Sequence, residues 1–213
     1  MQLRRNLLMQ ELSLIPAGYT QVEYIKSDGT AYIATGLNAF EGIGFDITFY
    51  TSNTIGSNGY GCIFGGRKSS GNNDFQLTTF HASSNNWSGT FRYGGTSSGM
   101  EWNAGITLNT KQTAKMHNRV FTPPSGAGTT LNSYSFSEGK EIFLFLLNNN
   151  GTPAQGGSGC RIYDMKIYDA SDKVIRHYIP CVRDSDSVVG MYETKNKQFL
   201  ANASSSGQFT IPT

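Results

Sequence analysis

The chain has 213 residues, of which 38% are hydrophobic, 12% aromatic and only 15% charged, with 25 glycines and a net charge of +2. This composition is typical of many short strands joined by glycine-rich turns, since globular chains carry about 25% charged residues. The near-neutral charge argues against a nucleic-acid partner, and no apolar run reaches the ~18 residues that a membrane span requires.

Residues 1–14 form an N-terminal extension with a basic start and leucines that share one face of a helix. Polar Gln10 and Glu11 interrupt the apolar patch, and no small-residue cleavage site follows, so a secretory signal peptide is disfavoured. Two interpretations stay open: a frayed tail, or a peptide for attachment or oligomerisation. The second interpretation predicts an assembly contact through Leu3, Arg4, Arg5, Leu7 and Leu8.

Strand patterns begin at Tyr19 and continue to the end of the chain. A Pro-Gly entry leads to a strand, an Asp28-Gly29 turn and a second strand that reaches Gly36. Apolar and other residues alternate with a period of two, which predicts strands with one buried face. The alternation is clear at Ile43, Phe45, Ile47 and Phe49 and at Phe75, Leu77 and Thr79, and weaker at Ala114, Met116 and Val120.

The second half of the chain continues this pattern. Residues 142–147 are apolar on both faces, which indicates a central strand covered on both sides. Residues 161–168 and 174–179 predict a hairpin, and three shorter strands follow around 189–192, 198–200 and 208–211. Residues 83–103 predict loops around one strand at 90–93. About a dozen strands without a linker predict one all-β domain over residues 15–213, a sandwich or a barrel.

Two stretches resemble a known family. Residues 15–36 are IPAGYTQVEYIKSDGTAYIATG, and the C-terminal part carries CRIYDMKIYD at 160–169 and VIRHYIPCVR at 174–183. They resemble the opening and closing strands of the concanavalin A-like lectin/glucanase (laminin G-like) domains that recur in phage virion proteins and gut-bacterial surface proteins. The resemblance covers roughly residues 15–55 and 140–211, and it implies an antiparallel jelly-roll β-sandwich.

Most residues of these stretches have structural roles in this interpretation. Gly18 and Gly29 would serve turns. Pro180 would end a strand, because proline lacks the backbone donor. The side chains expected to face the core are Tyr24, Ile33, Ile162 and Ile167.

No catalytic motif is evident in the sequence. Glycosidases on this fold use carboxylates at alternate positions of one strand, and the nearest candidate here, Asp184-Ser185-Asp186, has the polar neighbours of a solvated loop. We therefore expect no enzyme; a glycosidase with a non-standard site is the least favoured alternative.

No cofactor is expected either. The three histidines (His81, His117 and His177) lack partners at metal-ligand spacing, and the three cysteines (Cys62, Cys160 and Cys181) form no C-x-x-C pair. Asp74 with Asn72 and Asn73 could bind calcium, although a plain turn is the favoured interpretation. A Cys160–Cys181 bridge is possible, while the odd cysteine count fits a reducing cytoplasm slightly better.

Glycan binding is the remaining chemistry. Sugars are held by aromatic rings that stack on their apolar faces and by amide or charged groups that bond the hydroxyls. The middle of the chain offers Trp87, Arg92, Tyr93 and Trp102 among many Asn and Ser residues. The alternative is that the tryptophans pack beneath loops.

These observations lead to two functional hypotheses. The first is a non-enzymatic phage virion protein, a decoration or fibre component on the head or tail surface. It would be assembled in many copies or as a homo-oligomer in the bacterial host cytoplasm and would contact other virion proteins through the N-terminal peptide. Binding of host or mucus glycans is a further role that this hypothesis leaves open. The alternative is a carbohydrate-binding module or adhesin on a bacterial surface.

Overall fold

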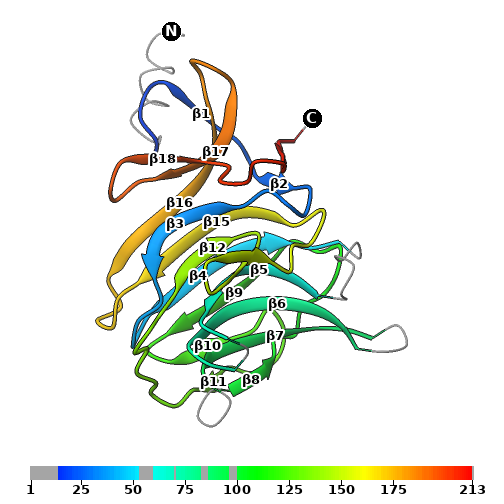
Figure 1. Ribbon diagram of the computed structural model, residues 1–213, viewed down its shortest axis with the longest axis vertical. Helices are drawn as coiled ribbons and strands as arrows, with labels where there is room; N and C mark the ends of the chain where they lie inside the picture. The colour runs from blue at the N-terminus through cyan, green and yellow to red at the C-terminus, as the bar shows by residue number, and fades with distance from the viewer. Residues whose placement is uncertain (1–13, 53–59, 70, 83–85, 96–99, 213) are drawn as a thin grey trace, which may run out of the picture.

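The computed structural model describes residues 14–52, 60–69, 71–82, 86–95 and 100–212. The predicted assembly residues Leu3, Arg4, Arg5, Leu7 and Leu8 lie outside this part of the chain. All regular elements in the described ranges are strands, and they form two facing sheets (Figure 1). A search of the described residues for a helix long and apolar enough to cross a membrane finds none.

The first sheet carries the two ends of the described chain. Its order is β11 (Thr129–Thr130), β10 (Val120–Thr122), β9 (Gln112–His117), β4 (Gly44–Tyr50), β15 (Arg161–Tyr168), β16 (Val174–Arg183), β17 (Val188–Glu193) and β18 (Gln198–Ala201). Three short strands extend it: β1 (Tyr19–Gln21) pairs with β16, β2 (Ile25–Ser27) pairs with β15, and β19 (Phe209–Thr210) pairs with β2. β1, β17 and β18 lie together at one end of the molecule (Figure 1).

The second sheet is built mainly from the middle of the chain. Its order is β14 (Thr152–Ala154), β13 (Leu147–Asn149), β5 (Tyr60–Arg67), β6 (Asp74–Ala82), β7 (Asn86–Gly94) and β8 (Met100–Asn103), and β12 (Glu141–Leu144) joins β5 to β3 (Ile33–Asn38). Neighbouring strands of both sheets run antiparallel, apart from the parallel β5–β13 pair. The predicted all-β jelly-roll sandwich is confirmed.

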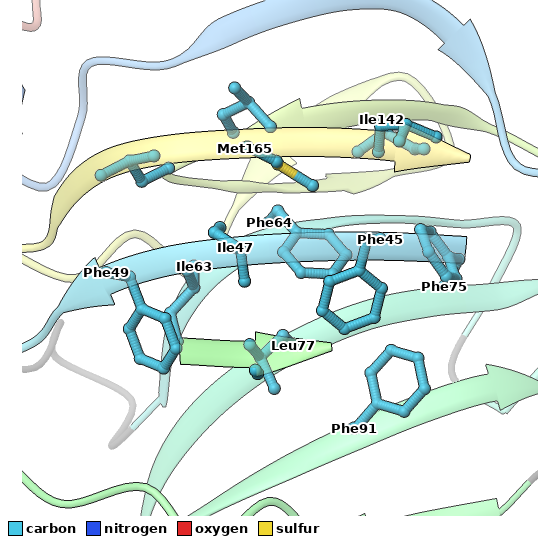
Figure 2. Close-up of a cluster of buried hydrophobic side chains, with 14 of the residues drawn as sticks. Phe45, Ile47, Phe49, Ile63, Phe64, Phe75, Leu77, Phe91, Ile142 and Met165 are labelled. Carbon is cyan, nitrogen blue, oxygen red and sulfur yellow. The ribbon is translucent and has the colours of Figure 1, made fainter. Parts of the chain in front are cut away.

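Phenylalanines of both sheets fill the core between them. Phe45, Ile47 and Phe49 of β4 are fully buried, as the alternation predicts. The Phe45 ring packs 4.8 Å from Phe64 and 5.9 Å from Phe75 of the facing sheet (Figure 2). Edge-on ring packing of this kind adds to the stability from burial of apolar area.

The structure differs from four local expectations. The Asp28-Gly29 turn forms, but the strands on either side of it do not pair with each other, because β2 and β3 belong to different sheets. The apolar run 142–147 is buried but broken, since Phe145 has a φ of 73° between β12 and β13.

Residues 83–103 contain a second strand, β8, besides the longer β7. Val120 is 38% exposed, because Asn118 and Arg119 form a turn with positive φ.

Pro180 lies inside β16 and does not end it. At this point β16 changes its neighbour on one side, from β15 at Tyr178 to β1 at Cys181. The Pro180 carbonyl accepts a hydrogen bond from Val22 N on that side. The N–H and C=O of one residue point to the same side of a strand. The N–H that Pro180 lacks would therefore point to the side on which β16 changes its partner, where no ladder hydrogen bond is lost.

Candidate functional site

Aromatic and cationic side chains gather on the outer face of the first sheet, which points away from the core. We call Tyr24, Tyr50, Arg161 and Tyr163 the tyrosine–arginine surface. Strand alternation turns these side chains outward, since the neighbouring Ile25, Phe49 and Ile162 are fully buried. All four residues are partly exposed.

A β-bulge places Tyr163 on this face. The pairing of β15 with β4 runs from Ile162↔Phe49 to Asp164↔Thr48, which leaves Tyr163 as the extra residue. Ile162 and Met165 both face the core although they are three positions apart, so Tyr163 and Asp164 both point outward. The bulge thereby adds a third ring beside Tyr24, whose centroid lies 5.2 Å from that of Tyr163.

Arg161 lies against two of the rings. Its guanidinium carbon is 4.3 Å from the Tyr50 centroid and 4.7 Å from the Tyr24 centroid. The Tyr50 hydroxyl donates to Asn109 Oδ1 at 3.0 Å, which holds that ring in place. Two cation–π contacts restrict the guanidinium without neutralising its charge.

Further charged groups border the surface. Lys111 Nζ lies 4.0 Å from the Tyr163 centroid and 3.1 Å from Glu23 Oε1. Both side chains are more than half exposed, so this pair contributes little to stability. Lys26 lies directly opposite Arg161 in β2. Lys26 and Lys111 thus add positive charge beside Arg161, and Glu23 pairs with Lys111.

Arg161 differs from the other arginine that lies over a ring of this face. Arg183 lies 4.8 Å from the Phe199 centroid, but it also donates two hydrogen bonds to Asp186, at 3.0 and 2.7 Å. In the described part of the chain, Arg161 forms no ion pair with a carboxylate, and its buried Nε has no acceptor. Arg161 is thus a positioned cation with its anion-binding capacity unused.

The arrangement suits a sugar that carries an anionic group. Tyrosine rings stack on the apolar faces of sugar rings, and a guanidinium binds a carboxylate or sulfate with two parallel hydrogen bonds. Because Arg161 is already held by Tyr24 and Tyr50, it would lose little side-chain entropy on binding.

Tyr24 lies on this surface, whereas the family resemblance predicts that it faces the core, and that prediction is wrong. The signal that could have placed it outside is the alternation at Ile25, Lys26 and Ser27, where the first and third residues are buried. Arg161 and Tyr163 carry no such signal, because the contact with Tyr24 depends on pairing across more than 130 positions of sequence and on a bulge.

The residues predicted to bind glycans lie on the second sheet and are only partly brought together. Tyr93 is 2% exposed and packs against Phe75, and its hydroxyl accepts a hydrogen bond from Gly42 N. It is therefore not a surface ring. Arg92, its neighbour in β7, lies 3.5 Å from Asp74 Oδ2 on the opposite face.

The two tryptophans are placed only through their backbone. Trp87 of β7 pairs with His81 of β6, and Trp102 of β8 pairs with Phe91 of β7. Their side chains lie outside the described part of the structure, so their glycan-binding role stays a prediction.

The candidate metal ligand Asp74 has protein partners, and the three cysteines are free thiols. Asp74 is 1% exposed, accepts a hydrogen bond from Gly71 N and faces Arg92. No group of three or more His, Cys, Asp or Glu in the described ranges is placed to hold a metal ion. Cys62, Cys160 and Cys181 are buried and free, so the Cys160–Cys181 bridge does not form.

Comparisons with known proteins give fold-level likeness only. No family model matches the chain, and no curated protein matches its sequence. Among solved structures, the Ruminococcus gnavus IT-sialidase CBM40 bound to α2,3-sialyllactose is 16% identical, with a TM-score of 0.45, over 70% of this chain and 90% of that one. A second structure of that module has the same identity and TM-score over 73% and 91%. The K499G mutant of Streptococcus pneumoniae NanB sialidase is 11% identical, with a TM-score of 0.47, over 94% of this chain and 39% of that one.

Proposed function

We propose that this chain is a non-catalytic carbohydrate-binding domain whose tyrosine–arginine surface binds a glycan with a carboxylate or sulfate group. The observation that carries the proposal is Arg161, which lies against two tyrosine rings and has no carboxylate partner in the described structure. The likeness to sialidase modules carries no part of it, because those TM-scores are below 0.5.

Each group has a distinct role in the proposed complex. Tyr24, Tyr50 and Tyr163 supply apolar ring surface for the sugar. Arg161 binds the anionic group, and Lys111 and Lys26 raise the local positive potential that attracts it. A neutral sugar would leave the Arg161 guanidinium without an anionic partner, so the surface favours acidic glycans over neutral ones.

Affinity electrophoresis tests this proposal. Gels that contain polygalacturonate, hyaluronan or polysialic acid should retard the wild-type protein more than gels with neutral starch or galactomannan. Arg161→Gln should weaken binding at least about tenfold, because a hydrogen bond to a charged group contributes about 1.5–3 kcal/mol. The matched control is Arg183→Gln, which removes an arginine whose donors are already bound to Asp186.

Two results would overturn the proposal. One is the absence of retardation by every acidic polysaccharide. The other is equal retardation of Arg161→Gln and wild type, with both proteins folded by circular dichroism.

The virion hypothesis and the assembly role of the N-terminal extension stay predictions from the sequence. A virion protein and a glycan-binding module are compatible functions, because a surface domain of a particle can itself bind host glycans. Mass spectrometry of purified particles from the source, with the copy number of this chain as the readout, tests the virion location separately.

A further inference from the structure

A cleft of about 460 Å³ shares no lining residue with the tyrosine–arginine surface. Three segments distant in sequence form its walls: the β2–β3 turn with Thr30 and Tyr32, the segment after β14 with Gln155 and Gly156, and the C-terminal segment with Ser204 and Ser205. Its volume falls within the range of ~300–1,000 Å³ that is usual for small-ligand sites.

Hydrogen bonds fix the walls of the cleft. The Asp28 carboxylate accepts from the backbone N–H groups of Thr30, Ala31 and Gln208, which ties the turn to the C-terminal segment. Asn202 Oδ1 accepts from Tyr32 N and Ser204 N. The cleft is thus largely pre-formed, and a ligand would not have to order it.

The cleft offers the groups that a neutral sugar requires. The Tyr32 ring stacks on Phe143 at 4.6 Å, which fixes the ring beside the cleft. The Gln155 amide, the Tyr32 hydroxyl and the Ser205 hydroxyl form no hydrogen bond to any described residue. None of the described side chains that line the cleft is charged. A charged ligand would find no counter-charge here, whereas sugar hydroxyls would find donors and acceptors.

The backbone at Gln155 is also unusual. Its φ of 56° lies in the left-handed region, which is unfavourable for a residue other than glycine, asparagine or aspartate. Its carbonyl accepts from Cys62 N at 2.6 Å, so the backbone conformation is anchored in the second sheet. A glycine would fit this backbone without strain, yet the position carries a long amide side chain at the edge of the cleft.

We propose that this cleft is a second binding site, for one neutral pyranose unit, in which Tyr32 provides the stacking surface and Gln155 bonds the hydroxyls. The site is independent of the tyrosine–arginine surface in position, charge and chemistry. A single neutral sugar in an open cleft would bind weakly, with a Kd of about 1–10 mM, because few atoms contribute.

The test is a ¹H–¹⁵N NMR titration of the full chain with the methyl glycosides of glucose, galactose, mannose, N-acetylglucosamine and fucose. We expect at least one of them to shift the amides of residues 29–32, 154–156 and 203–205. Gln155→Gly should weaken that binding about three- to tenfold while it relieves the left-handed strain. Tyr32→Leu, which keeps apolar bulk against Phe143, should abolish binding.

Two controls separate this site from other effects. Asn150→Gly makes the same kind of substitution at an exposed turn residue with a φ of 53°, and should leave sugar binding unchanged. Arg161→Gln should also leave it unchanged, so failure of the acidic-glycan proposal would not affect this one. The inference is overturned if no methyl glycoside shifts these amides, or if Gln155→Gly and Tyr32→Leu both bind like wild type while folded.

Discussion

At the scale of single residues, His117 joins three parts of the first sheet. Its Nε2 lies 2.7 Å from Asp46 Oδ1 in β4, and its Nδ1 lies 2.5 Å from Asp172 Oδ1 in the β15–β16 turn. Ionised carboxylates only accept hydrogen bonds, so both ring nitrogens act as donors and the imidazolium form is favoured. Burial opposes that charge, but the hydrogen bonds and charges of Asp172 and Asp46 outweigh it and raise the pKa of His117 above its usual 6.5.

We therefore expect a pH-dependent loss of stability that His117→Gln removes. The folded pKa is above the unfolded one, so the stabilisation is fully present below pH 6.5 and is lost as the pH rises through the raised folded pKa. Urea unfolding across this range should show the free energy of unfolding of wild type falling toward that of His117→Gln. A difference between the two proteins that stays constant with pH would contradict the assignment.

A second prediction at the scale of single residues concerns the reactivity of the three cysteine thiols. Burial raises the pKa of all three thiols, and those of Cys160 and Cys181 to about 12. Because the thiolate is the nucleophile, iodoacetamide should modify the native protein slowly at mildly alkaline pH and the urea-unfolded protein fast. Intact-mass measurement follows both reactions. A Cys160–Cys181 disulfide in the untreated protein, or equal rates in the two states, would contradict the structure.

At the scale of elements, Gly156 shows how closely the walls of the cleft approach each other. A Cβ at this position would lie 1.9 Å from the Gly29 carbonyl oxygen and 2.4 Å from Leu146 Cδ2. Gly156→Ala should therefore lower the free energy of unfolding by about 1–3 kcal/mol, because the clash is with backbone and a buried side chain. The neighbouring Gly157→Ala, whose Cβ would meet its nearest atom at 3.3 Å, should cost less. Equal melting temperatures for the two variants would contradict this packing.

The same scale shows what the sequence could and could not predict. The period of two predicted the buried face of β4, because burial of alternate residues is a local property of a strand. The same pattern predicted one buried face for β6, and that prediction is wrong, since Asp74, Gln76 and Thr78 are as buried as the apolar residues between them. Partner choice is not local: β2 and β3 flank one turn and yet join different sheets. The Tyr163 bulge and the change of partner at Pro180 likewise depend on strands far along the chain. For this reason the core was largely predictable, whereas the tyrosine–arginine surface was not.

At the scale of the whole molecule, one face of the first sheet packs against the second sheet to form the core. The other face carries the tyrosine–arginine surface and a small hydrophobic cluster. Near its β16–β17 end, Ile15, Ile179, Cys181 and Tyr192 form a small second hydrophobic cluster. Leu14, next to this cluster, is 61% exposed. The N-terminal extension therefore leaves the described domain beside an apolar region.

The predicted assembly role of the extension can be tested through the size of the protein. If Leu3, Leu7 and Leu8 form an assembly contact, deletion of residues 1–12 should convert a multi-copy species into a monomer without unfolding the sandwich. Analytical ultracentrifugation of both chains measures this. The same number of subunits in the full and shortened proteins would contradict the assembly role.

The central claim is that an acidic glycan binds at the tyrosine–arginine surface. A glycan array that presents matched acidic and neutral oligosaccharides tests it most directly, with wild type, Arg161→Gln and Arg183→Gln applied side by side. We predict signal on carboxylated or sulfated glycans for wild type and Arg183→Gln, and its loss for Arg161→Gln. Acidic-glycan signal that survives in Arg161→Gln, or binding to neutral glycans alone, would contradict the account.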